Sequence, residues 1–171
     1  MGPEGGSGPP DPTLGALGTL RQTRRALVAV VDALPDAART AVPDGFRNHV
    51  LWNAGHLAAT EQLLSFGLAG RDLDLPHGFV EDFRKGSSPL DWRREWAWDE
   101  VRGLLLALPD RTEAAYRDGQ LGAFARPYRT TPGVVLATVE DAARFNLYHE
   151  GLHLGTVLAL RKLVGPRVAG A

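Results

Sequence analysis

Apolar residues recur every three or four positions in four stretches of the chain, and this spacing predicts four long amphipathic helices. The first begins at Asp11, where an aspartate followed by Pro12 suits a helix cap and first turn, and Pro35 ends it. Its apolar stripe consists of Leu17, Leu20, Leu27, Val28, Val31 and Leu34. The second helix runs from about residue 46 to 68, and Gly70 follows it as a stop.

The other two helices are predicted in the second half of the chain. One begins at Ser88, with Pro89 in its first turn and Asp91 placed for a capping box, and its apolar face extends to Leu108. The last opens near Thr131 and continues to residue 163 or 164, before Gly165-Pro166. Residues 70–88 and 121–133 are expected to be loops, and no segment combines strong β alternation with a hairpin turn. The pattern predicts an all-α fold, a four-helix bundle.

The composition refines this picture. A length of 171 residues suggests one domain, over residues 11–171, after a Gly-, Pro- and Ser-rich tail at residues 1–10 that is expected to be disordered. The formal net charge of -1 gives no pull toward nucleic acid or an anionic membrane. No apolar run reaches the roughly 20 residues of a membrane span, and no secretory signal is visible, so a cytoplasmic protein is expected. The absence of cysteine excludes disulfides, thiolate zinc sites and a cysteine nucleophile.

Two of the five histidines lie four residues apart in the last predicted helix. A helix turns by about 100° per residue, so His149 and His153 differ by about 40° in direction and share one face. Ala142 and Leu160 continue that face, which therefore points toward the interior of the bundle. Two readings remain for this pair: a metal site, or core histidines that bond to backbone carbonyls.

The second helix supplies a third imidazole. His49, Trp52 and His56 occupy one face of it, and small residues around His56 would let a facing helix come close. Three histidines leave a coordination position open, as catalytic zinc sites do, and imidazole suits zinc, nickel, copper or iron. His56 is the preferred third ligand because it lies in mid-helix. His49 is expected at the rim, and His77 is expected to be exposed in a polar loop.

Two segments resemble the signatures of a known family. "WNAGHLAATE" and "YHEGLHLGTVLALRKLVG" are similar to those of the DinB-like (DinB/YfiT) superfamily, in which a histidine precedes Leu-Ala and the last helix carries His-Glu-x-x-His. The resemblance covers about residues 13–165. It implies an up-down-down-up four-helix bundle, often a homodimer, with a divalent metal held by His56, His149 and His153. Characterised relatives are transferases or isomerases that use low-molecular-weight thiols such as glutathione, mycothiol or bacillithiol.

These features lead to three functional hypotheses. The first is a divalent-metal-binding protein, with zinc, nickel or iron, that acts as a thiol-dependent S-transferase on small electrophiles. The thiol would come from a cosubstrate, in keeping with the absence of cysteine. The second is a hydrolase in which the metal activates water. The third is a non-catalytic helical binding or dimerisation module whose histidines belong to the core. No catalytic residue is assigned.

The neighbouring charged and aromatic residues allow more than one interpretation. His-Glu-Gly-Leu-His matches the zinc-protease pattern, but the chain lacks a strand-rich domain, so Glu150 is expected behind a ligand or at the surface. Glu61 could orient a ligand histidine or be a solvated charge. Arg144 and Tyr148 flank the histidine face and could contact an anionic cosubstrate, or simply form an exposed side. Trp92, Trp96 and Trp98 favour core or dimer packing over a substrate pocket.

Overall fold

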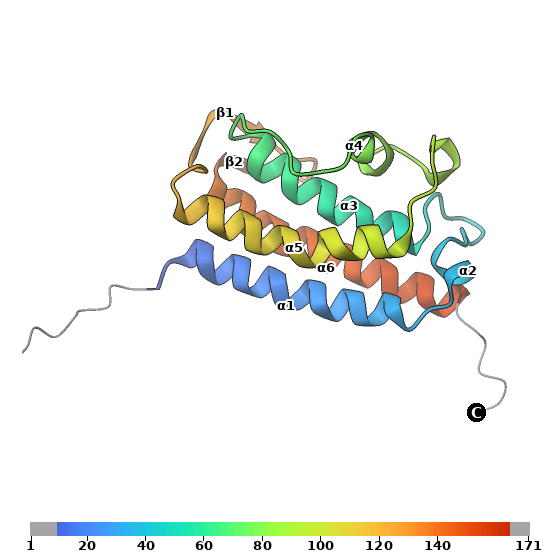
Figure 1. Cartoon of the computed structure of the whole chain (residues 1–171). Coiled ribbons are helices and arrows are strands. Elements are labelled where there is room, and N and C mark those ends of the chain that lie inside the picture. The colour runs from blue at the N-terminus through green and yellow to red at the C-terminus, as the bar shows by residue number, and fades with distance from the viewer. Residues whose placement is uncertain (1–9, 165–171) are drawn as a thin grey trace, which may run out of the picture.

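The computed structural model describes residues 10–164 and shows a mostly helical protein with a small two-stranded sheet (Figure 1). The long helices are α1 (Pro12–Asp32), α3 (Val50–Gln62), α5 (Trp98–Arg117) and α6 (Val139–Val164). A π-helical turn, η1 (Leu63–Gly67), extends α3. The smaller elements are α2 (Asp36–Arg39), α4 (Phe79–Phe83), the 3-10 turn η2 (Pro89–Asp91), β1 (Ala123–Arg129) and β2 (Val135–Thr138).

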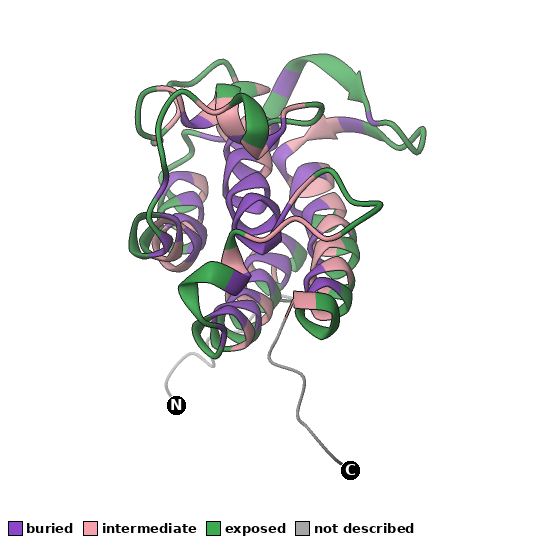
Figure 2. Cartoon of the chain, turned by 90° about the vertical axis from the view of Figure 1, so that its right-hand side faces the viewer, coloured by how far each residue is buried: buried purple, intermediate pink, exposed green. Residues whose placement is uncertain are grey.

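The long helices surround one main core. Helix α1 packs against α5 and α6, and α3 packs against the same two helices from the other side. Figure 2 shows buried residues on the inward sides of these helices and exposed residues outside. Helix α3 is buried at every position except Thr60, because α4 and the segment around it cover its outer side (Figure 1).

The ends of the first two long helices follow from their caps. The Asp11 carboxylate accepts a hydrogen bond from the Thr13 backbone nitrogen at 2.7 Å, so α1 begins where the sequence predicts. Helix α3 begins at Val50, later than predicted, because the His49 ring caps it by accepting from the Trp52 backbone nitrogen at 2.9 Å. The loop predicted at residues 70–88 contains the short helix α4, and the short helix α2 lies between α1 and α3.

The predicted start of the third helix at Ser88 is wrong. Pro89 lies in the short turn η2, and α5 begins only at Trp98, where the Glu100 carboxylate accepts from the Ala97 backbone nitrogen. The chain before it cannot join the helix, because the indoles of Trp92 and Trp96 both donate to Asp82 and hold residues 92–96 against α4. The helix then continues through Pro109 to Arg117, beyond the apolar face that the sequence analysis traced to Leu108.

The predicted start of the last helix near Thr131 is also wrong, since a β-hairpin precedes α6. Strands β1 and β2 pair antiparallel, with Tyr128 opposite Leu136 and Arg129 opposite Val135. Of β1, only Phe124 is buried, so the strand lacks the alternation by which a half-buried strand is recognised. The turn between them includes Gly133 at φ +92°, a left-handed conformation that favours glycine. The expectation of an all-α fold therefore holds for most of the chain but not for this hairpin.

Two predictions fall largely on the chain ends. The tail predicted at residues 1–10 lies, apart from Pro10, outside the described residues, and so does the helix stop at Gly165-Pro166. Within residues 10–164, none of the helices is both long and apolar enough to cross a lipid bilayer.

A close approach between α3 and α4 depends on Gly55. A Cβ atom built there would lie 2.3 Å from Cδ1 and Cε1 of the buried Phe83 ring, far inside van der Waals contact. Phe83 therefore rests directly on the backbone of α3, which fixes the height of α4 above the helix.

We expect Gly55→Ala to destabilise the protein by about 1–3 kcal/mol, because the methyl group must displace a fully buried ring. Urea unfolding followed by circular dichroism measures the change. Gly103→Ala is the matched control, since Gly103 lies on α5 with no atom within 4 Å of an added Cβ. There the substitution should stabilise by about 0.4–1 kcal/mol. Equal effects at the two positions would contradict the packing described.

Candidate metal centre

The structure brings His56 of α3 together with His149 and His153 of α6. One nitrogen from each ring can be chosen so that all three lie within 4.8 Å of one another. The ring centroids are 5.1 Å apart for His56 and His149, 4.7 Å for His56 and His153, and 4.5 Å for the α6 pair. His56 is buried and the other two are half-buried, so the cluster lies near the surface between α3 and α6.

The orientation of His56 is set by the chain that covers α3. Its Nδ1 lies 2.7 Å from the Phe83 backbone oxygen, and a carbonyl can only accept, so Nδ1 carries the proton and donates it. Nε2 is then the unprotonated nitrogen, and it accepts a long hydrogen bond from the Thr60 hydroxyl at 3.4 Å. Trp52 stacks on the same ring at 4.8 Å between centroids, which restrains its rotation.

Asn53 orients His153 in the same manner. The Asn53 side-chain nitrogen donates to the His49 backbone oxygen at 2.9 Å, which identifies the other end of the amide as its oxygen. That oxygen lies 2.8 Å from Nδ1 of His153, so Nδ1 donates and Nε2 is left free. Asn53 is buried, and its effect resembles the outer hydrogen bonds that fix the tautomer of metal-bound histidines.

His149 is held by packing. Its ring lies nearly parallel to that of Phe145, at 6.3 Å between centroids, and within residues 10–164 neither of its nitrogens makes a hydrogen bond. Both nitrogens are therefore available to an ion.

The cluster favours neutral imidazoles. Burial lowers the pKa of His56, and burial with the nearby His153 and His56 lowers the pKa of His149 to about 3. Burial with His56 lowers the pKa of His153 to about 4. All three rings are thus uncharged at neutral pH, which is the form that binds metals.

This donor set fits a divalent transition metal. Nε2 is unprotonated on two rings whose Nδ1–H groups are bonded to oxygen, and within residues 10–164 the third ring has no competing partner. One nitrogen from each ring lies within 4.8 Å of the others, a spacing at which one ion could be shared by all three. The set supplies three protein ligands and leaves room for a further one.

The remaining two histidines lie apart from this cluster. His49 is buried, which corrects the expectation of a rim position, and its Nδ1 is occupied as the cap of α3. Burial lowers the pKa of His49 to about 4. His77 is exposed in the segment before α4, where the sequence placed it.

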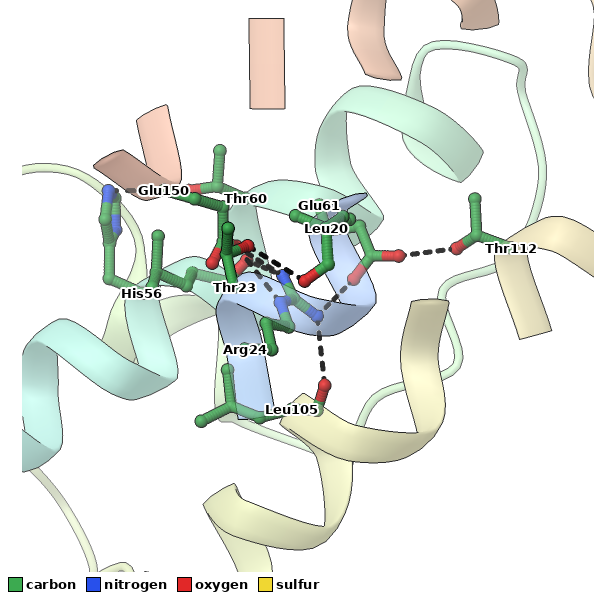
Figure 3. Close-up of polar contacts among 10 residues, drawn as sticks. Leu20, Thr23, Arg24, His56, Thr60, Glu61, Leu105, Thr112 and Glu150 are labelled. Carbon is green, nitrogen blue, oxygen red and sulfur yellow. Dashed lines mark hydrogen bonds and ion pairs between the residues drawn. The ribbon is translucent and has the colours of Figure 1, made fainter. Parts of the chain in front are cut away.

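Behind the histidines lies a buried ion-pair network that the sequence analysis did not identify. Figure 3 shows the guanidinium of Arg24 between the carboxylates of Glu61 and Glu150. Nε and Nη2 of Arg24 donate to Glu150 Oε1 at 3.0 and 2.8 Å, and Nη1 donates to Glu61 Oε2. The three side chains are 1 to 5 % exposed. Thr112 of α5 completes the network by donating to Glu61 Oε1 at 2.7 Å.

The network also supports the backbone of the long helices. Arg24 Nη2 donates to the Leu57 oxygen of α3 at 3.1 Å. Nη1 lies 3.5 Å from the Leu105 oxygen, the carbonyl whose helical partner would be the N–H that Pro109 lacks. This contact helps to explain how α5 accommodates a proline. Although burial opposes it, the Glu150 and Glu61 carboxylates hold the pKa of Arg24 above its usual value.

These contacts correct the expectations for the two glutamates. Neither is a solvated surface charge: the described contacts of Glu61 are with Arg24 and Thr112 and those of Glu150 with Arg24, rather than with a histidine. The Glu150 carboxylate is bonded to Arg24, so it is not placed as the base of a zinc protease. A signal for Arg24 was present in the sequence, because it falls between Leu20 and Leu27 on the apolar stripe of α1.

Three of the four tryptophans bond to Asp82 of α4. The indoles of Trp52 and Trp92 donate to the Asp82 backbone oxygen at 3.1 and 2.9 Å, and the Trp96 indole donates to its carboxylate at 2.7 Å. Trp98 bonds instead to Asp32 at 2.7 Å. Trp96 and Trp98 are buried, in keeping with the expectation of packing residues. Asp82 immediately precedes Phe83, so these bonds also position the carbonyl that His56 contacts.

Comparisons with known proteins bear on this arrangement. A family model described as the DinB superfamily matches residues 19–157, which include all three clustered histidines. A crystal structure of a conserved protein from Enterococcus faecalis is similar with a TM-score of 0.53 and 16 % identity, covering 89 % of this chain and 94 % of that one. At this identity the likeness shows the fold alone. No curated protein matches the sequence.

We expect Arg24→Met to destabilise the protein by about 3–5 kcal/mol, because it leaves two buried carboxylates without their cation. Adding Glu61→Gln and Glu150→Gln to that variant should recover much of the loss, since no buried charge then remains. Arg25→Met, at an exposed position on the same helix, should change the stability by less than about 0.5 kcal/mol. Urea unfolding at pH 7.5 tests all three, and a mild effect of Arg24→Met alone would contradict the network.

The metal-free protein should lose stability as the pH falls from about 6.5 to 4. In that window the unfolded histidines take up protons while His149 and His153, with folded pKa values of about 3 and 4, do not. Each contributes at most about 1.4 kcal/mol per pH unit. Urea unfolding of EDTA-treated wild type and of the His149→Gln/His153→Gln variant at pH 7 and 5 measures the difference. The variant should lose less, and parallel losses would show that these rings do not titrate as described.

Proposed function

The chain belongs to the DinB superfamily, and from this membership and the histidine cluster we propose that it is a divalent-metal-dependent enzyme that acts as a thiol-dependent S-transferase on small electrophiles. The observation that carries the proposal is the convergence of three neutral imidazoles, two of which have Nδ1–H bonded to oxygen and therefore an unprotonated Nε2. Histidines that served only as core residues would not need this matched orientation.

In this proposal His56, His149 and His153 hold the metal, which is zinc, nickel or iron. When bound, the cation favours the thiolate form of a low-molecular-weight thiol. The chain has no cysteine, so the nucleophilic sulfur has to come from that cosubstrate. Asn53 and the Phe83 carbonyl orient two of the rings, and Trp52 restrains one of them.

The architecture implied by the family is part of the proposal. The reciprocal packing of α1 and α3 against α5 and α6 supports an up-down-down-up four-helix bundle to which the hairpin and the short helices are added. The homodimer and the small-molecule substrate stay predictions.

We expect His149→Ala to abolish metal retention. Only His56 and His153 would remain as ligands, fewer than the three protein ligands of catalytic zinc sites. Elemental analysis of protein purified without added chelator measures the metal content. His77→Ala is the matched control and should retain the wild-type content, since His77 is exposed and lies outside the cluster. Equal metal content in both variants would refute the ligand assignment.

The reaction is tested separately from the metal. Wild-type protein loaded with zinc, nickel or iron(II) should accelerate the consumption of glutathione, mycothiol or bacillithiol in the presence of an epoxide or an α,β-unsaturated carbonyl. The rate should fall to background in the His149→Ala variant. Metal-dependent cleavage of an ester without any thiol requirement would favour the hydrolase alternative, and metal binding without either reaction would leave only the metal site.

A further inference from the structure

A recess beside the histidine cluster has an apolar lining. It lies between the β1–β2 turn and α6, where Pro132, Val134 and Val135 face Phe145 and Tyr148. Its volume is about 330 Å³. This falls at the lower end of the range for small-molecule sites, about 300–1,000 Å³.

The apolar side chains of this recess are open to solvent. Val134 is 46 % exposed, Val135 is 45 % and Tyr148 is 53 %. Single exposed apolar residues are ordinary, but these three line the same hollow. An apolar ligand of matching size would remove this surface from water.

The recess is also lined by a cationic side chain, that of Arg144. The Arg144 side chain is 59 % exposed, and the nearest carboxylate oxygen within the described chain is Asp141 Oδ1 at 3.9 Å, beyond hydrogen-bond distance. Asp141 is occupied elsewhere, because its Oδ2 accepts from the backbone nitrogens of Ala137 and Thr138 at 3.0 and 3.2 Å. The negative charge of Asp141 offsets part of the positive charge of Arg144. The N–H donors of the Arg144 guanidinium are nevertheless available, and their planar arrangement matches the two oxygens of a carboxylate.

The recess adjoins the histidine cluster through Phe145. This ring lines the recess, lies 5.7 Å from the Tyr148 ring and stacks beside His149 at 6.3 Å between centroids. A ligand in the recess would therefore contact the same ring that packs on a proposed metal ligand.

We propose that this recess binds the substrate of the reaction, and that the substrate class is small molecules with an apolar body and one carboxylate. The apolar body lies against Val135, Phe145 and Tyr148, and the carboxylate pairs with Arg144. The inference refines the proposed function and rests on it for the role of substrate, whereas the binding of such molecules depends on the recess alone.

The test uses hexanoate and its uncharged counterpart 1-hexanol as probes. Both are titrated into the full ¹⁵N-labelled chain, with zinc and after EDTA treatment, and amide shifts are followed by NMR. Hexanoate should shift the amides of residues 133–135 and 144–148 and bind more tightly than hexanol. Arg144→Gln should weaken hexanoate by about tenfold, the effect of one charge-assisted hydrogen bond, and leave hexanol unchanged.

Arg161→Gln is the matched control, because Arg161 is an exposed arginine further along α6 and should leave both affinities unchanged. Shifts located elsewhere, equal affinities of hexanoate and hexanol, or full hexanoate affinity in Arg144→Gln would each overturn the proposal. Hexanoate binding by a chain that binds no metal would refute the proposed function and keep the carboxylate site. Metal binding without hexanoate binding would refute the proposed substrate site in the recess and leave the proposed function standing.

Discussion

The arrangement of the long helices depends on one buried cation. Arg24 reaches from α1 into the interior, pairs with Glu61 of α3 and Glu150 of α6, and bonds to the α3 backbone. A guanidinium in such a place is costly to bury, and its donors are satisfied only when the surrounding helices stand at the right heights and rotations. Glu150 is the immediate neighbour of His149, and Glu61 lies five residues after His56. The network therefore sets the positions of the two helices that carry the histidines.

Backbone carbonyl groups, as well as side chains, orient the rings of the histidine cluster. The Phe83 carbonyl reaches His56 because Asp82 is held by three indoles and because Gly55 lets the Phe83 ring rest on α3. The His49 carbonyl orients Asn53, which in turn orients His153. Residues remote from the cluster thus determine which nitrogen of His56 and of His153 is unprotonated. The segment between α3 and α5, long for a connection, has a clear structural role as this outer support.

The sequence predicted the features that have strong periodic or motif signals. The apolar stripes located the long helices, Asp11 marked the first residue before α1, and the histidine spacings pointed to the residues that the structure brings together. It failed where a tertiary contact decides the local structure. The bonds from Trp92 and Trp96 to Asp82 keep residues 92–96 out of α5, and β1 is paired through its backbone with little burial. Arg24 and Asn53 were missed because single polar residues on apolar faces reveal their partners only in three dimensions.

The gathering of indoles around Asp82 has an optical consequence. Three of the four tryptophans of the chain share this one residue, and Trp52 among them stacks on His56. Most of the fluorescent indoles of the protein therefore lie in one neighbourhood, and one of them touches the histidine cluster. An ion with unpaired electrons that came to rest there would quench this emission, so the chain carries its own spectroscopic sensor.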